Sequence, residues 1–207
     1  MYRANWVVNQ LQKKSFGQAG EVLAERGIRQ FRLYFMIGLP LERAEDVRAI
    51  VELTKKFRHN LLERSRGKKG PEKIMISLSS FVPKPATPFQ WHPFEDLSSL
   101  REKIRAIRSG LRGEKGIAVE ADVPKWAYLQ SLLSRGDRRV GHLLLTAFRL
   151  GNNWPQAFRT VNVNPDFYVY RERSYEETLP WDFIDHGISK EYLWAEYQEA
   201  LKEGGKE

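Results

Sequence analysis

Apolar and polar residues alternate along the chain in blocks that predict strands and helices in turn. Residues 31–38 (FRLYFMIG) predict a strand whose end is too apolar to leave one face in water, as is typical of a buried parallel strand. Residues 73–82 predict a second strand, and residues 116–121 predict a short third one. The first two strands both end at a proline-marked corner, which in the first case reads Gly38-Leu39-Pro40.

Helices are predicted before and between these strands. Residues 16–26 predict a short helix that a glycine ends. After the first corner, Glu42, Glu45 and Asp46 are expected at the start of the next helix, where carboxylates stabilise the positive end of its dipole. Residues 97–111 place leucine and isoleucine at alternating steps of three and four residues, which predicts an amphipathic helix.

The order in which helices alternate with strands indicates the fold class. It predicts βα units joined by right-handed crossovers, and therefore a parallel sheet in an α/β protein. Three strands with both faces buried are too few for a closed barrel or for an open sheet of ordinary size. The sheet is therefore expected to be one part of a larger structure.

The character of the sequence changes after residue 121. Residues 122–136 and 140–154 predict two helices, and Ser189 caps a final helix that ends at Gly204-Gly205. Between them lies an aromatic-rich stretch with few strand signals. We therefore expect two domains, residues 1–121 with the parallel sheet and residues 122–207 as a mainly helical extension.

Composition narrows the class of protein further. Hydrophobic residues make up 42% of the chain, enough for a core. No stretch approaches the roughly 20 apolar residues of a membrane span, and the N-terminus lacks the plan of a signal peptide. We therefore expect a cytoplasmic protein without membrane contact.

Cysteine is absent from the sequence. This excludes disulfides, thiolate metal sites, cysteine nucleophiles and any iron–sulfur cluster held by this chain alone. The four histidines show no i, i+4 spacing, so no zinc site is predicted.

Positive charge is concentrated in one segment. Between Thr54 and Lys73 basic residues exceed acidic ones by six, out of a net charge of +8 for the chain. The middle of this segment (ERSRGKKGPEK) has glycine, proline and no apolar residue, which predicts a loop. A solvated loop is one interpretation, and a phosphate-contacting RNA-binding loop over residues 55–73 is the other.

Three motifs together resemble the radical S-adenosylmethionine (SAM) superfamily. The stretch YFMIGLPLE is similar to the end of the fifth strand in these enzymes, and SLSSFVPKPATPF is similar to the end of the sixth strand, as in methylthiotransferases. The stretches YLQSLLSRGDRRVGHLL and LPWDFIDHGISKEYLWAEYQEAL resemble the end of the radical SAM module in a bacterial family of uncharacterised fusion proteins. The resemblance extends from about residue 12 to residue 203.

The resemblance implies a partial parallel (β/α) barrel of which this chain holds the fifth and sixth strands. In the family, a Cys-x3-Cys-x2-Cys loop after the first strand holds a 4Fe-4S cluster, and reductive cleavage of SAM yields a 5′-deoxyadenosyl radical. This chain lacks those cysteines. It is therefore expected to be a C-terminal fragment, inert by itself, whose partner is the missing N-terminal half in the same polypeptide or from a split gene.

The resemblance also implies cofactor-binding residues. Those at the fifth strand would line the adenine pocket of SAM, and those at the sixth would offer main-chain hydrogen bonds to the adenine edge: Ile37, Gly38, Leu39, Pro40, Phe81 and Val82. Since Gly38 has no Cβ, a flat ligand could lie against the backbone there. The alternative is a helix-entry turn that needs glycine and proline for geometry alone.

Other polar residues are candidates for the substrate side, and no catalytic residue is assigned. Lys84 and Thr87 follow the sixth strand, in a proline-rich corner that is a structural feature in the alternative interpretation. Arg135, Arg138 and Arg139 form either a salt-bridged helix junction or a substrate or phosphate clamp. The motif WDFIDHG, with Asp182, Asp185 and His186, suggests capping or packing rather than acid–base chemistry.

Three functions follow as hypotheses. The first is the C-terminal part of a radical SAM enzyme. The second is a basic RNA-binding module, and the third is a non-catalytic interaction domain.

Overall fold

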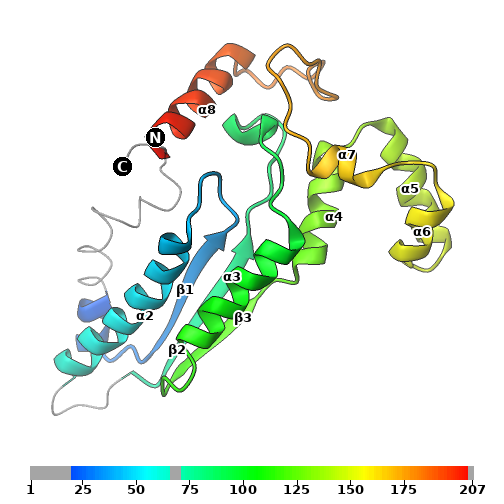
Figure 1. Ribbon diagram of the computed structural model, residues 1–207. Helices are drawn as coiled ribbons and strands as arrows, with labels where there is room; N and C mark the ends of the chain where they lie inside the picture. The colour runs from blue at the N-terminus through cyan, green and yellow to red at the C-terminus, as the bar shows by residue number, and fades with distance from the viewer. Residues whose placement is uncertain (1–19, 66–70, 205–207) are drawn as a thin grey trace. The chain divides into compact units, whose positions relative to one another are not determined.

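The computed structural model describes residues 20–65 and 71–204 (Figure 1). The chain forms two compact units that interleave along the sequence. Within the described residues, the first contains residues 20–65, 71–81, 97–123 and 203–204, and the second contains Val82–Asp96 and Pro124–Lys202. The loop after the second strand thus belongs to the second unit.

A three-stranded parallel sheet forms the centre of the first unit. Strands β1 (Gln30–Ile37), β2 (Lys73–Ser80) and β3 (Ile117–Ala121) lie in the order β1-β2-β3. Helix α2 (Ala44–Arg64) connects β1 to β2, and helix α3 (Leu97–Gly110) precedes β3. The predicted mixed α/β class with parallel strands is confirmed.

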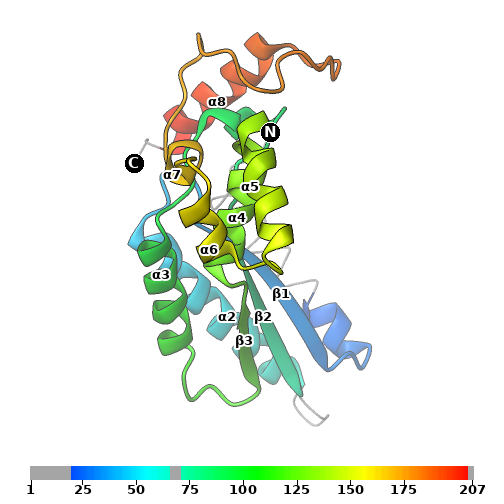
Figure 2. The same cartoon turned by 90° about the vertical axis from the view of Figure 1, so that its right-hand side faces the viewer.

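Helices α2 and α3 lie side by side on one face of this sheet (Figure 1, Figure 2). Phe31 on β1 meets Phe57 on α2 edge to face, with ring centroids 5.5 Å apart. Gly110 on α3 lies against Val51 on α2, where an added Cβ would come within 2.9 Å of both valine methyl carbons. The predicted amphipathic face of α3 is buried through Leu100, Ile104 and Ile107.

The other face of β1 differs from the prediction. Arg32, Tyr34 and Met36 point away from the helices, and Tyr34 and Met36 are 76% and 43% exposed. The expectation that β1 is buried on both faces is therefore wrong, because the helices of this unit cover only one face. Exposure alternates with every residue, as on a sheet with one covered face.

The second unit is mainly helical within the described residues. Its elements are η1 (Pro88–Trp91), α4 (Pro124–Arg135), α5 (Arg138–Arg149), α6 (Trp154–Thr160), α7 (Pro165–Val169) and most of α8 (Lys190–Gly204). The helices predicted over residues 122–136 and 140–154 correspond to α4 and α5. The two short helices α6 and α7 arise in the aromatic-rich stretch, and proline stands in the first turn of each.

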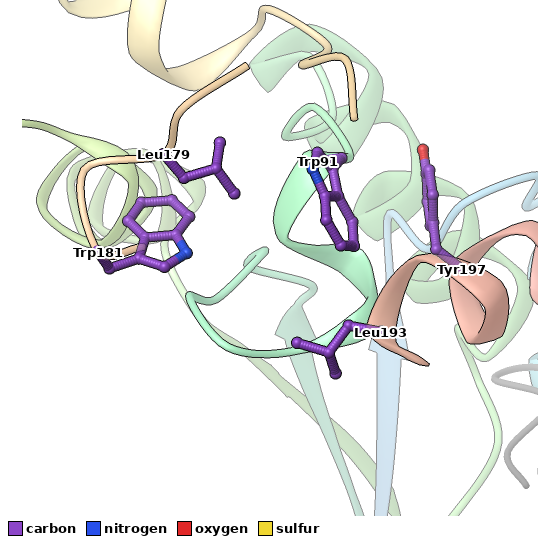
Figure 3. Packing of buried hydrophobic residues seen from close by; sticks show 5 residues of the cluster. All are labelled: Trp91, Leu179, Trp181, Leu193 and Tyr197. Carbon is purple, nitrogen blue, oxygen red and sulfur yellow. The ribbon is translucent and has the colours of Figure 1, made fainter. Parts of the chain in front are cut away.

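An aromatic core holds distant segments of the second unit together (Figure 3). Trp91 from η1 packs against Tyr197 on α8, with ring centroids 6.0 Å apart, and against Trp194, 5.0 Å away. Trp181 donates its indole N–H to the side-chain oxygen of the buried Gln90 at 2.6 Å. These residues lie about a hundred positions apart in the sequence, so the segment after β2 folds with the C-terminal region.

No helix in the described ranges of the chain is long and apolar enough to cross a membrane.

Candidate functional site

The carboxyl ends of β1 and β2 meet at one edge of the sheet in the first unit. Ile37 pairs with Ser80 in register, and the backbone N–H of Phe81 donates to the carbonyl of Ile37 at 2.8 Å. The chain then turns at Gly38, whose φ of 78° lies in the left-handed region. Leu41 also has a positive φ, 60°, which is rare for a residue with a side chain. The corner is therefore a sharply constrained turn at the strand end.

Apolar side chains from this corner are packed into the first unit. Ile37 is fully buried and Leu39 is 6% exposed, while Pro40 is half-buried. The four residues predicted from the fifth-strand motif thus form the end of β1 and the turn that follows it. Phe81 lies beside them through its bond to Ile37, whereas Val82 begins the second unit.

The buried carboxylate of Glu42 stabilises the corner. Its carboxylate accepts the backbone N–H of Leu39 at 3.3 Å and lies 3.1 Å from the ammonium group of Lys103, and its side chain is 1% exposed. Helix α2 begins only at Ala44, after the cap residue Arg43. The expectation that Glu42 lies in the first helical turn is therefore wrong, because the carboxylate folds back on the Gly-Leu-Pro turn and pairs with α3.

The conformation of Gly38 makes a prediction about stability. An L-residue in the left-handed region costs about 1–2 kcal/mol. We expect Gly38→Ala to lower the free energy of unfolding of the first unit by about that amount, as measured by denaturant unfolding with circular dichroism.

A helical glycine supplies the control. Gly141 lies in helix α5, and in Gly141→Ala the added Cβ would meet nothing within 4 Å, so this change is expected to be neutral or stabilising by up to about 1 kcal/mol. A Gly38→Ala protein as stable as the wild type would contradict the strained turn.

A polar network crosses the uncovered face of the sheet. The guanidinium of Arg32 on β1 donates to the hydroxyl of Ser77 on β2 and to the carboxylate of Glu120 on β3, both at 3.0 Å. These residues were not predicted as part of a site. The sequence pattern that could have identified the uncovered face is the period of two in β1, where Arg32, Tyr34 and Met36 alternate with apolar residues that face the helices.

In the second unit, Lys84 and Thr87 lie in the proline-rich segment after β2. The ammonium group of Lys84 donates to Gln130 at 3.2 Å and to Ser134 at 3.0 Å, both on α4. Burial lowers the pKa of Lys84 below its usual value. The hydroxyl of Thr87 donates to the carbonyl of Lys84 at 2.8 Å. Both residues therefore stabilise this segment locally.

The three arginine candidates of the second unit have different environments. Arg135 is fully buried, and its guanidinium donates to the backbone carbonyls of His92, Val169 and Arg171. Arg138 is exposed, and Arg139 binds the carboxylate of Asp137 at 2.6 and 2.9 Å. The environment of Arg135 favours the helix-junction interpretation over a substrate clamp.

Asp137 is the cap of helix α5, and its titration can be predicted. Its carboxylate accepts the backbone N–H of Arg139 at 2.9 Å, and hydrogen bonds from the Arg139 side chain lower the pKa of Asp137 to about 2. Because this pKa is depressed in the folded state, the stabilisation is present at neutral pH and is lost as pH falls from about 4 towards 2.

We expect Asp137→Ala to lower the free energy of unfolding by about 1 kcal/mol at pH 7, because the cap is lost. Asp137→Asn keeps a capping oxygen and should lose less. Urea unfolding at pH 7 and at about pH 2 checks this, and equal losses for Asp137→Ala at both values would contradict it.

The acidic residues of the WDFIDHG motif stabilise turns. Asp182 accepts the backbone N–H of Leu179 at 2.8 Å and the ammonium group of Lys190 at 3.2 Å. Asp185 accepts the backbone N–H of Gly187 at 2.8 Å, and His186 is exposed. These contacts favour the predicted capping role.

Part of the basic segment lies outside the described residues, namely Arg66, Lys68 and Lys69. Among its described members, Lys55 and Arg58 lie 3.5 and 3.4 Å from the carboxylate of Glu114. These two positive charges therefore share one carboxylate within the first unit.

The described residues contain no group of three or more His, Asp or Glu side chains that could hold a metal ion.

Comparisons with known proteins give one informative match. The chain is 32% identical over 139 residues to uncharacterized protein MJ0966 of Methanocaldococcus jannaschii. The match covers 67% of this chain and 28% of that protein, so the chain spans less than a third of the length of its relative. No family model and no solved structure matches the chain.

Proposed function

We propose that this chain is the C-terminal part of a radical SAM enzyme, with β1 and β2 as the fifth and sixth strands of its barrel. The observation that carries the proposal is the one-sided sheet: helices α2 and α3 lie on one face, and Arg32, Ser77 and Glu120 form a polar network on the other. Parallel (β/α) barrels place helices outside and strand side chains inside. The greater length of the matched relative also supports a larger whole.

The iron–sulfur cluster does not fit this chain. A 4Fe-4S cluster needs thiolate ligands, and the sequence has no cysteine. In this proposal the cluster is held by the N-terminal half of the enzyme, and the chain alone is inert.

Adenine fits the corner of the first unit better. It is flat and largely apolar, and Gly38 presents backbone without a Cβ between the apolar residues Ile37 and Leu39. The N–H of Phe81 is already bound to Ile37, so the adenine edge would use other main-chain groups at the end of β2. Ligands of α/β sheets commonly bind at the carboxyl ends of the strands.

The residues of this chain would bind and orient SAM rather than react. The adenine would lie against the backbone of Gly38 and against Pro40, while the buried side chains of Ile37 and Leu39 would support the turn. Glu42 would fix the corner through Leu39 and Lys103. SAM and the cluster together would supply hydrogen-atom abstraction. The polar network around Arg32 would face the interior of the barrel, where the substrate binds.

Calorimetric titration of SAM tests the proposal. SAM is titrated into the chain alone and then into a mixture with a separately expressed, cluster-bearing N-terminal radical SAM half. We expect tight binding only in the mixture. In the mixture, Gly38→Ala should weaken binding about ten-fold, the equivalent of about 1.4 kcal/mol.

Gly113→Ala is the matched control for this titration. Gly113 has a φ of 84°, similar to that of Gly38, but lies in the exposed loop before β3, so its replacement adds comparable strain far from the corner. It should leave the affinity unchanged. Absence of SAM binding in both arms, or equal weakening by the two variants, would overturn the adenine site.

A further inference from the structure

Two arginine side chains are buried inside the second unit. Arg135 and Arg173 are 0% and 3% exposed. They are joined through the backbone, because the guanidinium of Arg173 donates to the carbonyl of Arg135. The backbone N–H of Arg173 donates to the carbonyl of Trp91 at 3.0 Å, and the guanidinium carbon of Arg173 lies 5.2 Å from the ring centre of Trp181. Arg173 therefore lies next to Trp91 and Trp181, two residues of the aromatic core that Figure 3 shows.

Several buried donors here have no hydrogen-bond acceptor among the described residues. They are Nε and Nη1 of Arg173, Nε of Arg135 and Nε1 of Trp91. All four atoms are N–H donors. Buried polar groups are nearly always hydrogen-bonded, so these unpaired donors call for an acceptor.

Positive charge around Arg173 also exceeds negative charge. Both carboxylate oxygens of Glu177 accept hydrogen bonds from the guanidinium of Arg171, each at 2.6 Å. The Nε of Arg173 lies 4.0 Å from the same carboxylate. Three guanidinium groups thus share one carboxylate. Asp137, the next acid that influences Arg173, is itself bound by Arg139 and Tyr168.

Burial of an uncompensated cation is costly, and the electrostatics of both arginines reflect it. Burial, followed by the positive charges of Arg173 and Arg171, lowers the pKa of Arg135 to about 9. Burial also lowers the pKa of Arg173. A bound anion would reverse both effects, because it neutralises charge and accepts hydrogen bonds at once.

We propose that Arg173, supported by Arg135, forms a binding site for a small oxyanion, the carboxylate or phosphate end of a ligand. A guanidinium offers two parallel donors, Nη1 and Nη2, that match two oxygens of such a group. Nη1 of Arg173 has no acceptor among the described residues, and Nη2, which carries two N–H groups, donates to the carbonyl of Arg135. The guanidinium of Arg173 also lies over the ring of Trp181, at a distance that allows a cation–π contact. This site lies within the second unit and does not depend on the proposed SAM function.

The first test uses the unaltered chain. Inorganic phosphate and acetate are titrated separately below about 10 mM, with ionic strength held constant by sodium chloride, so that general salt effects stay small. We expect saturable stabilisation by one or both anions, with a rise in Tm of about 5–10 °C at a concentration about 100 times Kd. Tryptophan fluorescence should saturate over the same range, because Trp181 borders the site.

The second test uses a pair of variants. Arg173→Gln removes the charge and the guanidinium donors, and it should abolish the saturable response. Arg138→Gln removes an exposed arginine of the same unit and should leave the response intact. The two anions distinguish a phosphate from a carboxylate ligand.

Three results would overturn the site. The first is the absence of a saturable response to either anion in the unaltered chain. This result would count against the site even if Arg173→Gln fails to fold. The second is an equal response in folded Arg173→Gln. The third is a crystal structure grown with saturating phosphate or acetate in which only water contacts Nε and Nη1 of Arg173.

Discussion

Replacing Arg135 by methionine is expected to lower the free energy of unfolding of the second unit by about 3–5 kcal/mol. Arg135 donates to His92 and Val169 through one nitrogen, at 2.7 and 3.0 Å, and to Arg171 through another, at 2.6 Å. Methionine fills similar volume but leaves these three carbonyls without their donor. Since the site is fully buried, water cannot readily replace the lost bonds.

Arg138→Met is the control for this change. Arg138 lies three residues further on and is exposed, so its replacement should alter stability by no more than about 0.5 kcal/mol. Urea unfolding followed by tryptophan fluorescence measures both variants, because Trp91 and Trp181 report on the second unit. A loss below about 1 kcal/mol in Arg135→Met would show that Arg135 does not hold these segments together.

The second unit is also expected to lose stability in mild acid, through His92. Its ring lies 3.0 Å from the hydroxyl of Tyr197, and its carbonyl is bound by Arg135. Burial first, and then the positive charge of Arg135, lowers the pKa of His92 from about 6.5 to about 4. The neutral ring is therefore the form that the folded unit accommodates.

The sign of the effect follows from this lowered pKa. Between pH 6.5 and 4 the unfolded chain binds a proton at His92 that the folded chain does not, so stability falls as pH falls. A difference of this size corresponds to a loss of about 3 kcal/mol by pH 4. We expect His92→Gln to flatten that part of the stability curve.

His142→Gln serves as the control, because His142 is exposed on α5. Denaturant midpoints measured from pH 7 to pH 4 should fall steeply for the wild type and for His142→Gln, and more gently for His92→Gln. Parallel curves for all three proteins would show that His92 is not the group responsible.

These two predictions are coupled through one contact. Arg135 binds the carbonyl of His92 and its charge contributes to the low pKa of that ring. Removal of Arg135 should therefore raise the pKa of His92. The Arg135→Met protein should be less stable than the wild type at neutral pH, and its stability should fall less steeply between pH 6.5 and 4.

Much of the first unit could be predicted because its signals are local. The apolar runs that end at Gly38 and near Val82 identify two strands, and the spacing of Leu100, Ile104 and Ile107 identifies the buried face of α3. The alternation of strands and helices indicates parallel pairing, since parallel strands need a crossover. The constrained turn at Gly38 is also local, because it depends on one residue without a Cβ.

Predictions failed where they depended on what covers a residue. The apolar end of β1 suggested burial on both faces, but coverage depends on where α2 and α3 pack, and they leave Tyr34 exposed. The acidity of Glu42 suggested a helix start, but Lys103, distant in the sequence, draws its carboxylate inward. Neither partner can be identified from the neighbours of these residues along the chain.

The sequence by itself determined the α/β class, the parallel order of the strands and the absence of thiolate ligands, because each follows from residue type or from short-range period. Only the tertiary structure decided that Arg135 and Arg173 are buried side by side while Arg138 remains exposed. An arginine is normally a surface residue, and its burial requires carbonyls brought together from residues as far apart as His92 and Arg171. Such a set of partners forms only when the chain has folded, so the charge-bearing core of the second unit belongs to the fold rather than to any local motif.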